Sequence, residues 1–263
     1  MKTLDIELQQ MALLYGLCLL PGLLLWLIGL RLSRDIGISI LRMSIQLALV
    51  GFYLKILFNL NHPWLNGLWI LMMLLVADLS ILRRAGLKVR YFALATFTAI
   101  ASSVLFSTAY LVILVIQPTH YYDARYIVPL SGMILGNCLQ GNVIALERFY
   151  SAVRKNENEY TTFLMLGATR WEAVRPYFKE AVKAALNPTI ASMATMGLVS
   201  LPGMMTGQIL GGSEPGLAVK YKIAIMICIF TSTTLDSIIN LKLSLAIAFN
   251  AFDVLKDEVI KKS

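Results

Sequence analysis

The chain has 263 residues, of which 58% are hydrophobic and only 14% are charged, and its formal net charge at pH 7 is +8. This composition excludes soluble globular, secreted, fibrous and disordered proteins, because none of these classes combines so many apolar residues with so few charged ones. The composition indicates an integral membrane protein.

Seven stretches can cross the membrane, because a helix of about 20 apolar residues spans the hydrocarbon layer of ~30 Å. The first follows acidic residues rather than a basic segment, so we interpret it as a retained span and not as a signal peptide. The sequence therefore predicts an all-α, polytopic protein with about seven transmembrane helices, forming one transmembrane permease domain over residues 1–263. The predicted spans are residues 11–30, 36–58, 64–82, 91–122, 126–146, 184–213 and 223–241.

Lysine and arginine are distributed unequally between the two sets of loops. One set, made of residues 31–35, 83–90, 147–186 and the tail after 252, holds 16 basic residues, whereas the opposite set holds four. Basic loops favour the cytoplasmic side of a cell membrane. We therefore expect the N-terminus outside, the C-terminus in the cytoplasm, and contacts with membrane lipid. Because no basic cluster is interleaved with aromatic residues, we do not expect a nucleic-acid partner.

Residues able to support catalysis or a resident cofactor are scarce. Cys18, Cys138 and Cys228 are isolated within apolar spans, and His62 and His120 lie in separate loops. There is no phosphate-binding loop of the GxxxxGK[ST] type, so the chain has no such means of hydrolysing ATP. We expect a non-catalytic membrane subunit without a cofactor of its own.

Residues 147–186 form a segment too long to be a simple connection between two membrane helices. Gly167 suits the left-handed position that ends a helix. Thr169 and Glu172 have the spacing of a capping box, which begins a new helix. The sequence thus predicts a cytoplasmic coupling segment in which a helix stops, turns and restarts. Pro176 is expected to kink the second helix unless that helix begins there.

The motifs of this segment and of two spans resemble a known family. Glu159, followed by Leu166-Gly167-Ala168-Thr169 and Trp171, resembles the coupling segment of ABC-transporter permeases. The sequences PLSGMILGN (129–137) and NPTIASMATMGLVSLPGMMTGQILGG (187–212) resemble the FetB/YbbM family of ABC permeases. This resemblance implies an iron-export permease that works with a separate FetA-like ATPase, which binds ATP and Mg²⁺. It assigns the docking of that ATPase to Glu159, Leu166, Gly167, Ala168, Thr169, Arg170, Trp171 and Glu172.

The same two spans carry glycines at every fourth residue, namely Gly132 with Gly136, and Gly203 with Gly207 and Gly211. Such spacing favours close helix contact. A break at Pro202 would in addition favour a wet cavity, because interrupted helices are tolerated in the membrane mainly there. The candidates for a translocation path are Asn137, Gln140, Asn142, Pro202, Gly203, Met204, Met205, Thr206, Gln208 and Asp236.

Asp78 and Asp236 are the acidic residues within the spans, and either could bind a cation in transit. Alternatively, they could pair with Arg42, Arg83 or Lys242 near the cytoplasmic interface. Met204, Met205 and Asp236 are weak candidates for metal ligands, although thioethers prefer softer ions than iron(II).

Two functions remain from the sequence. The first is a homodimeric permease of an ABC transporter, which exports a metal ion such as iron and is driven by a separate ATPase. The alternative is an ion- or proton-coupled secondary transporter that uses Asp78 and Asp236 as carriers. An odd number of spans disfavours the alternative, because equal inverted repeats require an even number.

Overall fold

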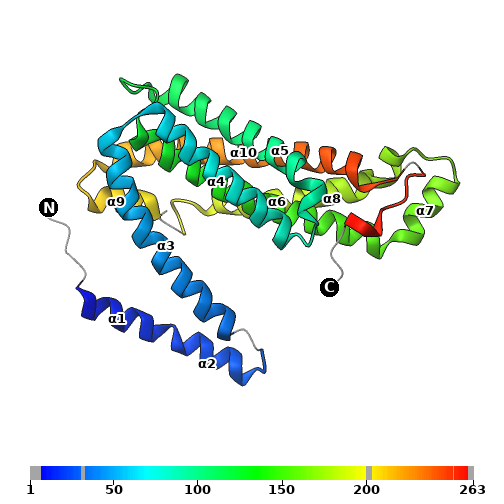
Figure 1. Cartoon of the computed structure of the whole chain (residues 1–263), viewed down its shortest axis with the longest axis horizontal. Coiled ribbons are helices and arrows are strands. Elements are labelled where there is room, and N and C mark those ends of the chain that lie inside the picture. The colour runs from blue at the N-terminus through cyan, green and yellow to red at the C-terminus, as the bar shows by residue number, and fades with distance from the viewer. Residues whose placement is uncertain (1–6, 31–32, 200–202, 251, 260–263) are drawn as a thin grey trace.

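The computed structural model describes residues 7–30, 33–199, 203–250 and 252–259. Regular structure in these residues is helical, as the composition predicts (Figure 1). The helices are α1 (Leu8–Leu17), α2 (Leu19–Leu27), α3 (Ser33–Leu60), α4 (Pro63–Arg84), α5 (Val89–Tyr110), the π-helical turn η1 (Leu111–Ile116), α6 (Ala124–Lys155), α7 (Glu157–Met165), α8 (Arg170–Thr195), α9 (Gly203–Leu210), α10 (Pro215–Ala248) and the 3₁₀ turn η2 (Asp257–Val259).

Six helical stretches among the described residues are long and apolar enough to cross a membrane. The expectation of a polytopic all-α membrane protein is thereby confirmed. The stretches are Gln9–Leu27, Arg34–Leu60, Pro63–Arg84, Val89–Ile116, Ala124–Lys155 and Pro215–Ala248.

The seventh predicted span, residues 184–213, is not a single helix. α8 ends at Thr195, the following Met196 is extended (φ −67°, ψ 133°), and Gly197 has a φ of +88°. A left-handed residue cannot continue a right-handed helix, so the chain turns here, and the next helix of the described residues, α9, begins at Gly203. The interruption therefore begins at Met196, before Pro202, which lies outside the described residues.

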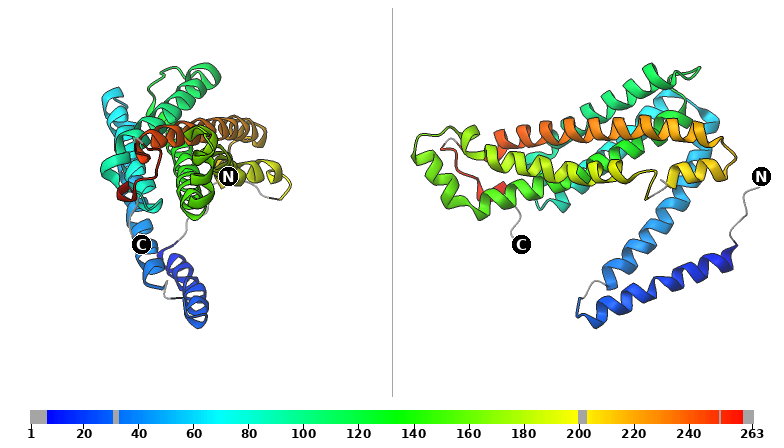
Figure 2. Two further views of the ribbon diagram at one scale, coloured as in Figure 1. Left: turned by 90° about the vertical axis from the view of Figure 1, so that its right-hand side faces the viewer. Right: turned by 180° about the vertical axis from the view of Figure 1, so that it is seen from behind.

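A bundle of α4, α5, α6, α8 and α10 forms the core of the molecule (Figures 1 and 2). α10 packs against α5, α6 and α8, and α6 packs against α4, α5 and α8. Phe92, Ile134 and Ile225 from three of these helices have no exposed surface. Lipid is as apolar as these side chains, so tight packing and polar contacts, rather than the removal of apolar surface from water, must hold the helices together.

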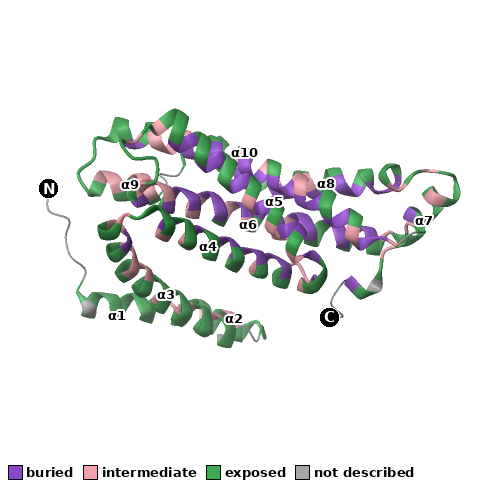
Figure 3. Ribbon diagram, turned by 45° about the horizontal axis from the view of Figure 1, so that its top comes forward, coloured by how far each residue is buried: buried purple, intermediate pink, exposed green. Residues whose placement is uncertain are grey.

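The N-terminal hairpin of α1, α2 and α3 diverges from this bundle, and nearly all of it is exposed (Figure 3). Only the last turns of α3 pack on the bundle, where Leu57 is fully buried and Tyr53 stacks on Trp69 at a ring distance of 4.0 Å. The helix is interrupted at Cys18, because Pro21 has no N–H to donate to the carbonyl of residue 17.

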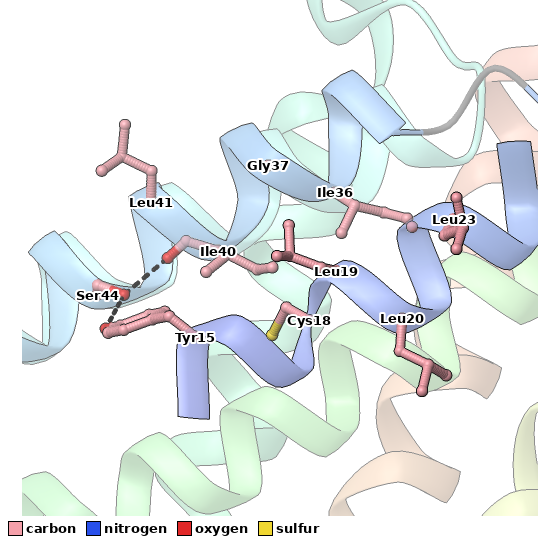
Figure 4. A pocket seen from close by; sticks show the side chains of 11 residues that line it. Tyr15, Cys18, Leu19, Leu20, Leu23, Ile36, Gly37, Ile40, Leu41 and Ser44 are labelled. Carbon is pink, nitrogen blue, oxygen red and sulfur yellow. Dashed lines mark hydrogen bonds between the residues drawn. The ribbon is translucent and has the colours of Figure 1, made fainter. Parts of the chain in front are cut away.

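An apolar groove of about 900 Å³ runs between α1–α2 and α3 within this hairpin (Figure 4). Leu19, Leu23 and Ile40 are among its lining residues. One polar contact crosses it in the described chain, between the Tyr15 hydroxyl and Ser44 Oγ at 2.7 Å. A surface of this kind suits lipid or another apolar helix.

The connections between helices gather at two opposite ends of the bundle. The α4–α5 turn, the α7 region and the C-terminal segment lie at one end, while the α3–α4, α5–α6 and α9–α10 connections lie at the other (Figures 1 and 2). The first of these ends thus holds residues 83–90 and the α7 region, which belong to the set of loops rich in lysine and arginine. At 1.5 Å per residue, α6 is about 48 Å long and exceeds the ~30 Å hydrocarbon layer. It can therefore carry α7 well outside the membrane.

Candidate functional site

A polar cavity of about 280 Å³ lies between α6, α8 and α10. Asn137 and Gln140 line it from α6, Thr189 and Ser192 from α8, and Lys222 from α10. Amide, hydroxyl and ammonium groups from three helices thus face one space, and two of these helices, α6 and α10, are long and apolar enough to cross a membrane. Because polar groups are costly in lipid, such a cavity is a candidate solute site.

Lys222 gives this cavity a positive charge. No Asp or Glu is among the described residues that line the cavity, and Lys222 belongs to neither of the two salt bridges of the described chain. An ammonium group without a nearby carboxylate disfavours a bare cation and favours an anion or a neutral polar solute.

A chain of hydrogen bonds crosses the core beside this cavity. Thr96 on α5 donates to Asn240 Oδ1 at 3.2 Å, and Asn240 Nδ2 donates to Asn142 Oδ1 at 3.0 Å. Asn142 Nδ2 in turn donates to Asp236 Oδ2. All four side chains are at most 1% exposed. The bonds connect α5, α6 and α10. Asn142 and Asp236 are not among the residues that line the cavity, whereas Asn137 and Gln140 are.

Close packing of α6 on α10 surrounds this chain of bonds. Cys138 Sγ lies 3.2 Å from Ser232 Oγ, and a Cβ added at Gly141 would lie 2.5 Å from Thr233 Cγ2. Gly141 is therefore the residue that permits the close approach of these helices. Close helix contact was also predicted at Gly136, Gly203 and Gly207. The described chain does not show it there, because an added Cβ at any of the three would meet nothing within 4 Å.

Neither intramembrane aspartate pairs with a cation in the described part of the chain. The two salt bridges there are Arg148–Glu180 and Arg170–Asp253, so the predicted pairing with Arg42, Arg83 or Lys242 is wrong. Asp78 is 4% exposed, and its Oδ1 has no hydrogen-bond partner among the described residues. The same holds for Asp236 Oδ1. Salt bridges to basic residues therefore do not account for the burial of these two carboxyl groups.

The residues after Pro202 lie on α9, next to a second cavity of about 320 Å³. Met205 lines this cavity together with Met193, Met196 and Met226, and Lys222 borders it as well. Met204 packs against the core of the bundle. The other candidates on this helix are Gly203, Thr206 and Gln208, which the structure does not place in either cavity.

The described residues contain no group of three or more His, Cys, Asp or Glu side chains placed to hold a metal ion. Asp236 lies in the buried hydrogen-bonded chain, whereas Met205 lines the methionine cavity on α9. The structure thus does not bring together Met205 and Asp236, two of the weak metal candidates from the sequence.

The coupling segment has the helix–turn–helix form that its sequence predicts, and we call residues 157–172 the elbow. α7 ends at Met165, Gly167 has a φ of +91°, and α8 begins at Arg170. Thr169 Oγ1 accepts from the Glu172 N–H at 3.3 Å, and Glu172 Oε2 accepts from the Thr169 N–H at 2.8 Å. These bonds form the predicted capping box. The Glu172 carboxylate also accepts from the Thr169 hydroxyl at 2.7 Å, and this bond, together with the one from the Thr169 N–H, lowers the pKa of Glu172.

Large apolar side chains at the turn of the elbow face outward. Met165 is 75% exposed and Leu166 is 79% exposed, and Trp171 is also exposed. On the inner side, the Tyr177 hydroxyl donates to Glu159 Oε2 at 3.1 Å. Burial and this contact with Glu159 raise the pKa of Tyr177 to about 12. α8 runs on through Pro176 and Pro188 to Thr195, so Pro176 does not mark the start of the helix.

Several residues of the site escaped the sequence analysis. The polar cavity is also lined by Thr189, Ser192 and Lys222. The buried chain of hydrogen bonds is extended by Thr96 and Asn240. A signal for the latter was present, because Ser232, Asp236, Asn240 and Ser244 recur every fourth residue on α10 and so share one helix face.

Comparisons with known proteins agree with this architecture. The model of the family described as "Uncharacterised protein family (UPF0014)" matches residues 8–249. The UPF0014 membrane protein slr1647 of Synechocystis is 36% identical over 83% of this chain and 80% of its own length.

Two further relatives carry functional names. The "Probable iron export permease protein FetB" of Escherichia coli is 30% identical over 89% of this chain and 88% of its own length. The protein ALUMINUM SENSITIVE 3 of Arabidopsis thaliana is 30% identical over 80% and 76%, respectively. No solved structure matches this chain. The family match over most of the sequence, together with the membrane-spanning helices, shows that the chain belongs to the UPF0014 family of membrane proteins.

Proposed function

We propose that this chain is the transmembrane permease subunit of an ABC transporter, in which two copies of the chain assemble with two copies of a separate cytosolic ATPase. The family membership and the relative named as a permease support a membrane permease. The partnership with an ATPase, the homodimer and the transported solute go beyond these comparisons.

The elbow is the observation that carries the proposal. It is a turn between two helices that a capping box holds in shape, and it exposes Met165 and Leu166. It lies at the end of the bundle that also holds the α4–α5 turn and the C-terminal segment (Figures 1 and 2). Exposed apolar side chains on such a turn suit a groove on another protein. In this proposal, the ATPase supplies that groove and binds ATP and Mg²⁺, and the elbow faces the cytoplasm of the cell.

The geometry suggests how the partner would drive transport. α8 begins within the elbow, at Arg170, and carries Thr189 and Ser192, which line the polar cavity. A movement of the elbow when the ATPase pair closes would therefore displace one wall of the cavity. Opening the cavity to alternate sides of the membrane is a rigid-body switch between two packed states.

For the solute, we propose a metal ion such as iron, moved outward, on the name of the FetB relative. Asn137 and Gln140 are the side chains of α6 that would meet it in the polar cavity. Because Lys222 repels a bare cation, the cavity should bind such an ion weakly and release it readily. Weak binding suits a permease, since a solute that binds tightly leaves slowly.

The test is the retention of a co-expressed ABC ATPase from the same organism on the affinity-tagged permease. Gly167 and Gly86 both have a left-handed φ, of +91° and +69°, and both have free space around an added Cβ. A Val at either position therefore imposes similar backbone strain, but only Gly167 lies in the elbow. We expect Gly167→Val to lose the ATPase and Gly86→Val to retain it. Equal retention by both variants would contradict docking at the elbow.

The unpartnered carboxyl oxygens of Asp78 and Asp236 favour the second candidate, an ion- or proton-coupled secondary transporter. The two functions differ in a simple assay. A secondary transporter moves solute in proteoliposomes that contain this chain alone and an ion gradient, and Asp236→Asn abolishes that transport. The ABC permease requires the ATPase and ATP, and metal ions should stimulate its ATP hydrolysis.

A further inference from the structure

The described chain beyond α10, residues 249–250 and 252–259, forms a segment that we call the C-terminal clasp. Phe249 and Leu255 form an antiparallel bridge, and the Lys256 N–H donates to the carbonyl of Ala248 at 2.9 Å. Asn250 Oδ1 accepts from the backbone N–H groups of residues 252 and 254, both at 2.9 Å. The clasp is thus attached directly to the end of α10 and is held in shape by its own hydrogen bonds.

The clasp contacts both helices of the elbow. On α8, Arg170 forms a salt bridge with Asp253 and places its guanidinium 5.8 Å from the centre of the Phe249 ring. On α7, the Tyr160 hydroxyl donates to the carbonyl of Asp253 at 2.5 Å, and its ring lies 5.8 Å from that of Phe249. The helices on the two sides of the Gly167 turn therefore contact the same two residues of the clasp, Phe249 and Asp253.

A third contact connects the clasp to the α4–α5 turn. The Lys88 N–H donates to the carbonyl of Val259 at 3.0 Å, and Val259 is only 1% exposed. The clasp therefore joins the elbow, α10 and the α4–α5 turn, which come from distant parts of the sequence.

We propose that the C-terminal clasp is a second mechanical link of the transporter, which transmits movements of the elbow to α10 through the pair of Arg170 and Asp253. This inference rests on the proposed function of the elbow as the dock of an ATPase. α8 connects the elbow to one wall of the polar cavity. The clasp connects the elbow to α10, which contributes Lys222 to another wall. Both walls then move together when the elbow moves.

The partial exposure of the Arg170–Asp253 salt bridge favours a role in connecting two segments over a role in stabilising the fold. Side-chain exposures of 35% and 33% place Arg170 and Asp253 partly in water, where a salt bridge contributes only about 0–1 kcal/mol to stability. Such a pair adds little to the free energy of unfolding, but it fixes the distance between two segments. The other salt bridge, Arg148–Glu180, joins α6 to α8 and leaves out the clasp, so it offers a matched control.

The experiment measures solute-stimulated and basal ATP hydrolysis of the complete complex in proteoliposomes, with iron(II) as the probe. The variants are Asp253→Arg, its charge-swapped combination with Arg170→Asp, the control Glu180→Arg, and the corresponding combination with Arg148→Glu. We expect Asp253→Arg to lower the ratio of stimulated to basal hydrolysis about fivefold, with the ATPase still bound. The swapped pair should restore the ratio, and both control variants should keep it.

Thermal unfolding separates this role from a structural one. If Asp253→Arg lowers the melting temperature but keeps the stimulation ratio, the pair is only structural and the proposal is overturned. Failure of the swapped pair to restore the ratio, in a complex that retains as much ATPase as the wild type, also overturns it. If the wild-type chain retains no ATPase, the proposed function itself fails, and the role of the clasp falls with it. If the wild type is stimulated and Asp253→Arg shows the same ratio of stimulated to basal hydrolysis, the proposed role of the clasp is refuted while the proposed function stands.

Discussion

Gly141 on α6 faces Thr233 on α10 so closely that a single methyl group cannot be added between them. A Cβ built on Gly141 would lie 2.5 Å from Thr233 Cγ2 and 3.7 Å from Ser237 Oγ. The helices that carry the buried chain of hydrogen bonds thus approach each other at a glycine, which has no side chain to keep them apart. Small residues commonly allow membrane helices to pack tightly in this way.

Gly141→Ala is therefore expected to destabilise the protein by about 1–3 kcal/mol, the usual cost of overpacking a core. Gly136 lies on the same helix with free space around an added Cβ, so Gly136→Ala serves as the control and should leave the stability unchanged or raise it by up to about 1 kcal/mol. Thermal unfolding of the detergent-purified variants checks this. Equal melting temperatures for the two variants would refute the close contact.

Asp236 and Asn142 are expected to be energetically coupled. Asp236→Ala removes the acceptor of the Asn142 amide and leaves a buried donor without a partner, at a cost of about 1–3 kcal/mol. Asn142→Ala should cost a similar amount, and the double variant should cost clearly less than the sum of both. A double-mutant cycle measured by unfolding gives the coupling energy. Additive costs would show that the two side chains act independently.

Lys222→Gln is expected to lower the iron(II) concentration that gives half-maximal stimulation of ATP hydrolysis, by about fivefold, because it removes a like charge from the wall of the cavity. The control is Lys220→Gln, since Lys220 is exposed on the same helix and does not line the cavity. A higher half-maximal concentration for Lys222→Gln would mean that the permease carries iron as an anionic complex or carries another anion.

Tyr160→Phe tests the clasp through its dependence on pH. Burial and the negative charge of Asp253 raise the pKa of Tyr160 to about 12 in the folded protein, from an ordinary value of 10.0. The hydrogen bond to the clasp needs the phenol proton. Its contribution to stability is therefore complete below pH 10 and is lost as the pH rises from 10 through about 12.

The wild type should consequently be more stable than Tyr160→Phe by about 1 kcal/mol at pH 8. This difference should shrink above pH 10, and chemical denaturation at several pH values measures it. Tyr177, which has a similarly raised pKa, is present in both proteins and cancels in the comparison. A difference that stays constant up to pH 12 would contradict the role of the Tyr160 proton.

The local features of this protein follow from its sequence, because they depend on neighbouring residues. Runs of about 20 apolar residues define the membrane helices. The elbow could be predicted residue by residue, since Gly167 ends one helix through its own backbone freedom and Thr169 with Glu172 begins the next. The prediction of residues 184–213 as one span was wrong for a local reason as well. The apolar composition of this stretch gave no sign of the turn at Met196 and Gly197.

Only the tertiary structure decided which polar groups meet. Thr96 and Asn240 are 144 residues apart, and Arg170 and Asp253 are 83 residues apart, so no local pattern could pair them. Likewise, Gly141 differs from Gly136 not in its own sequence context but in the helix that faces it. Burial, contact and electrostatic environment belong to the packed arrangement, because side chains from separate helices acquire neighbours only when those helices come together.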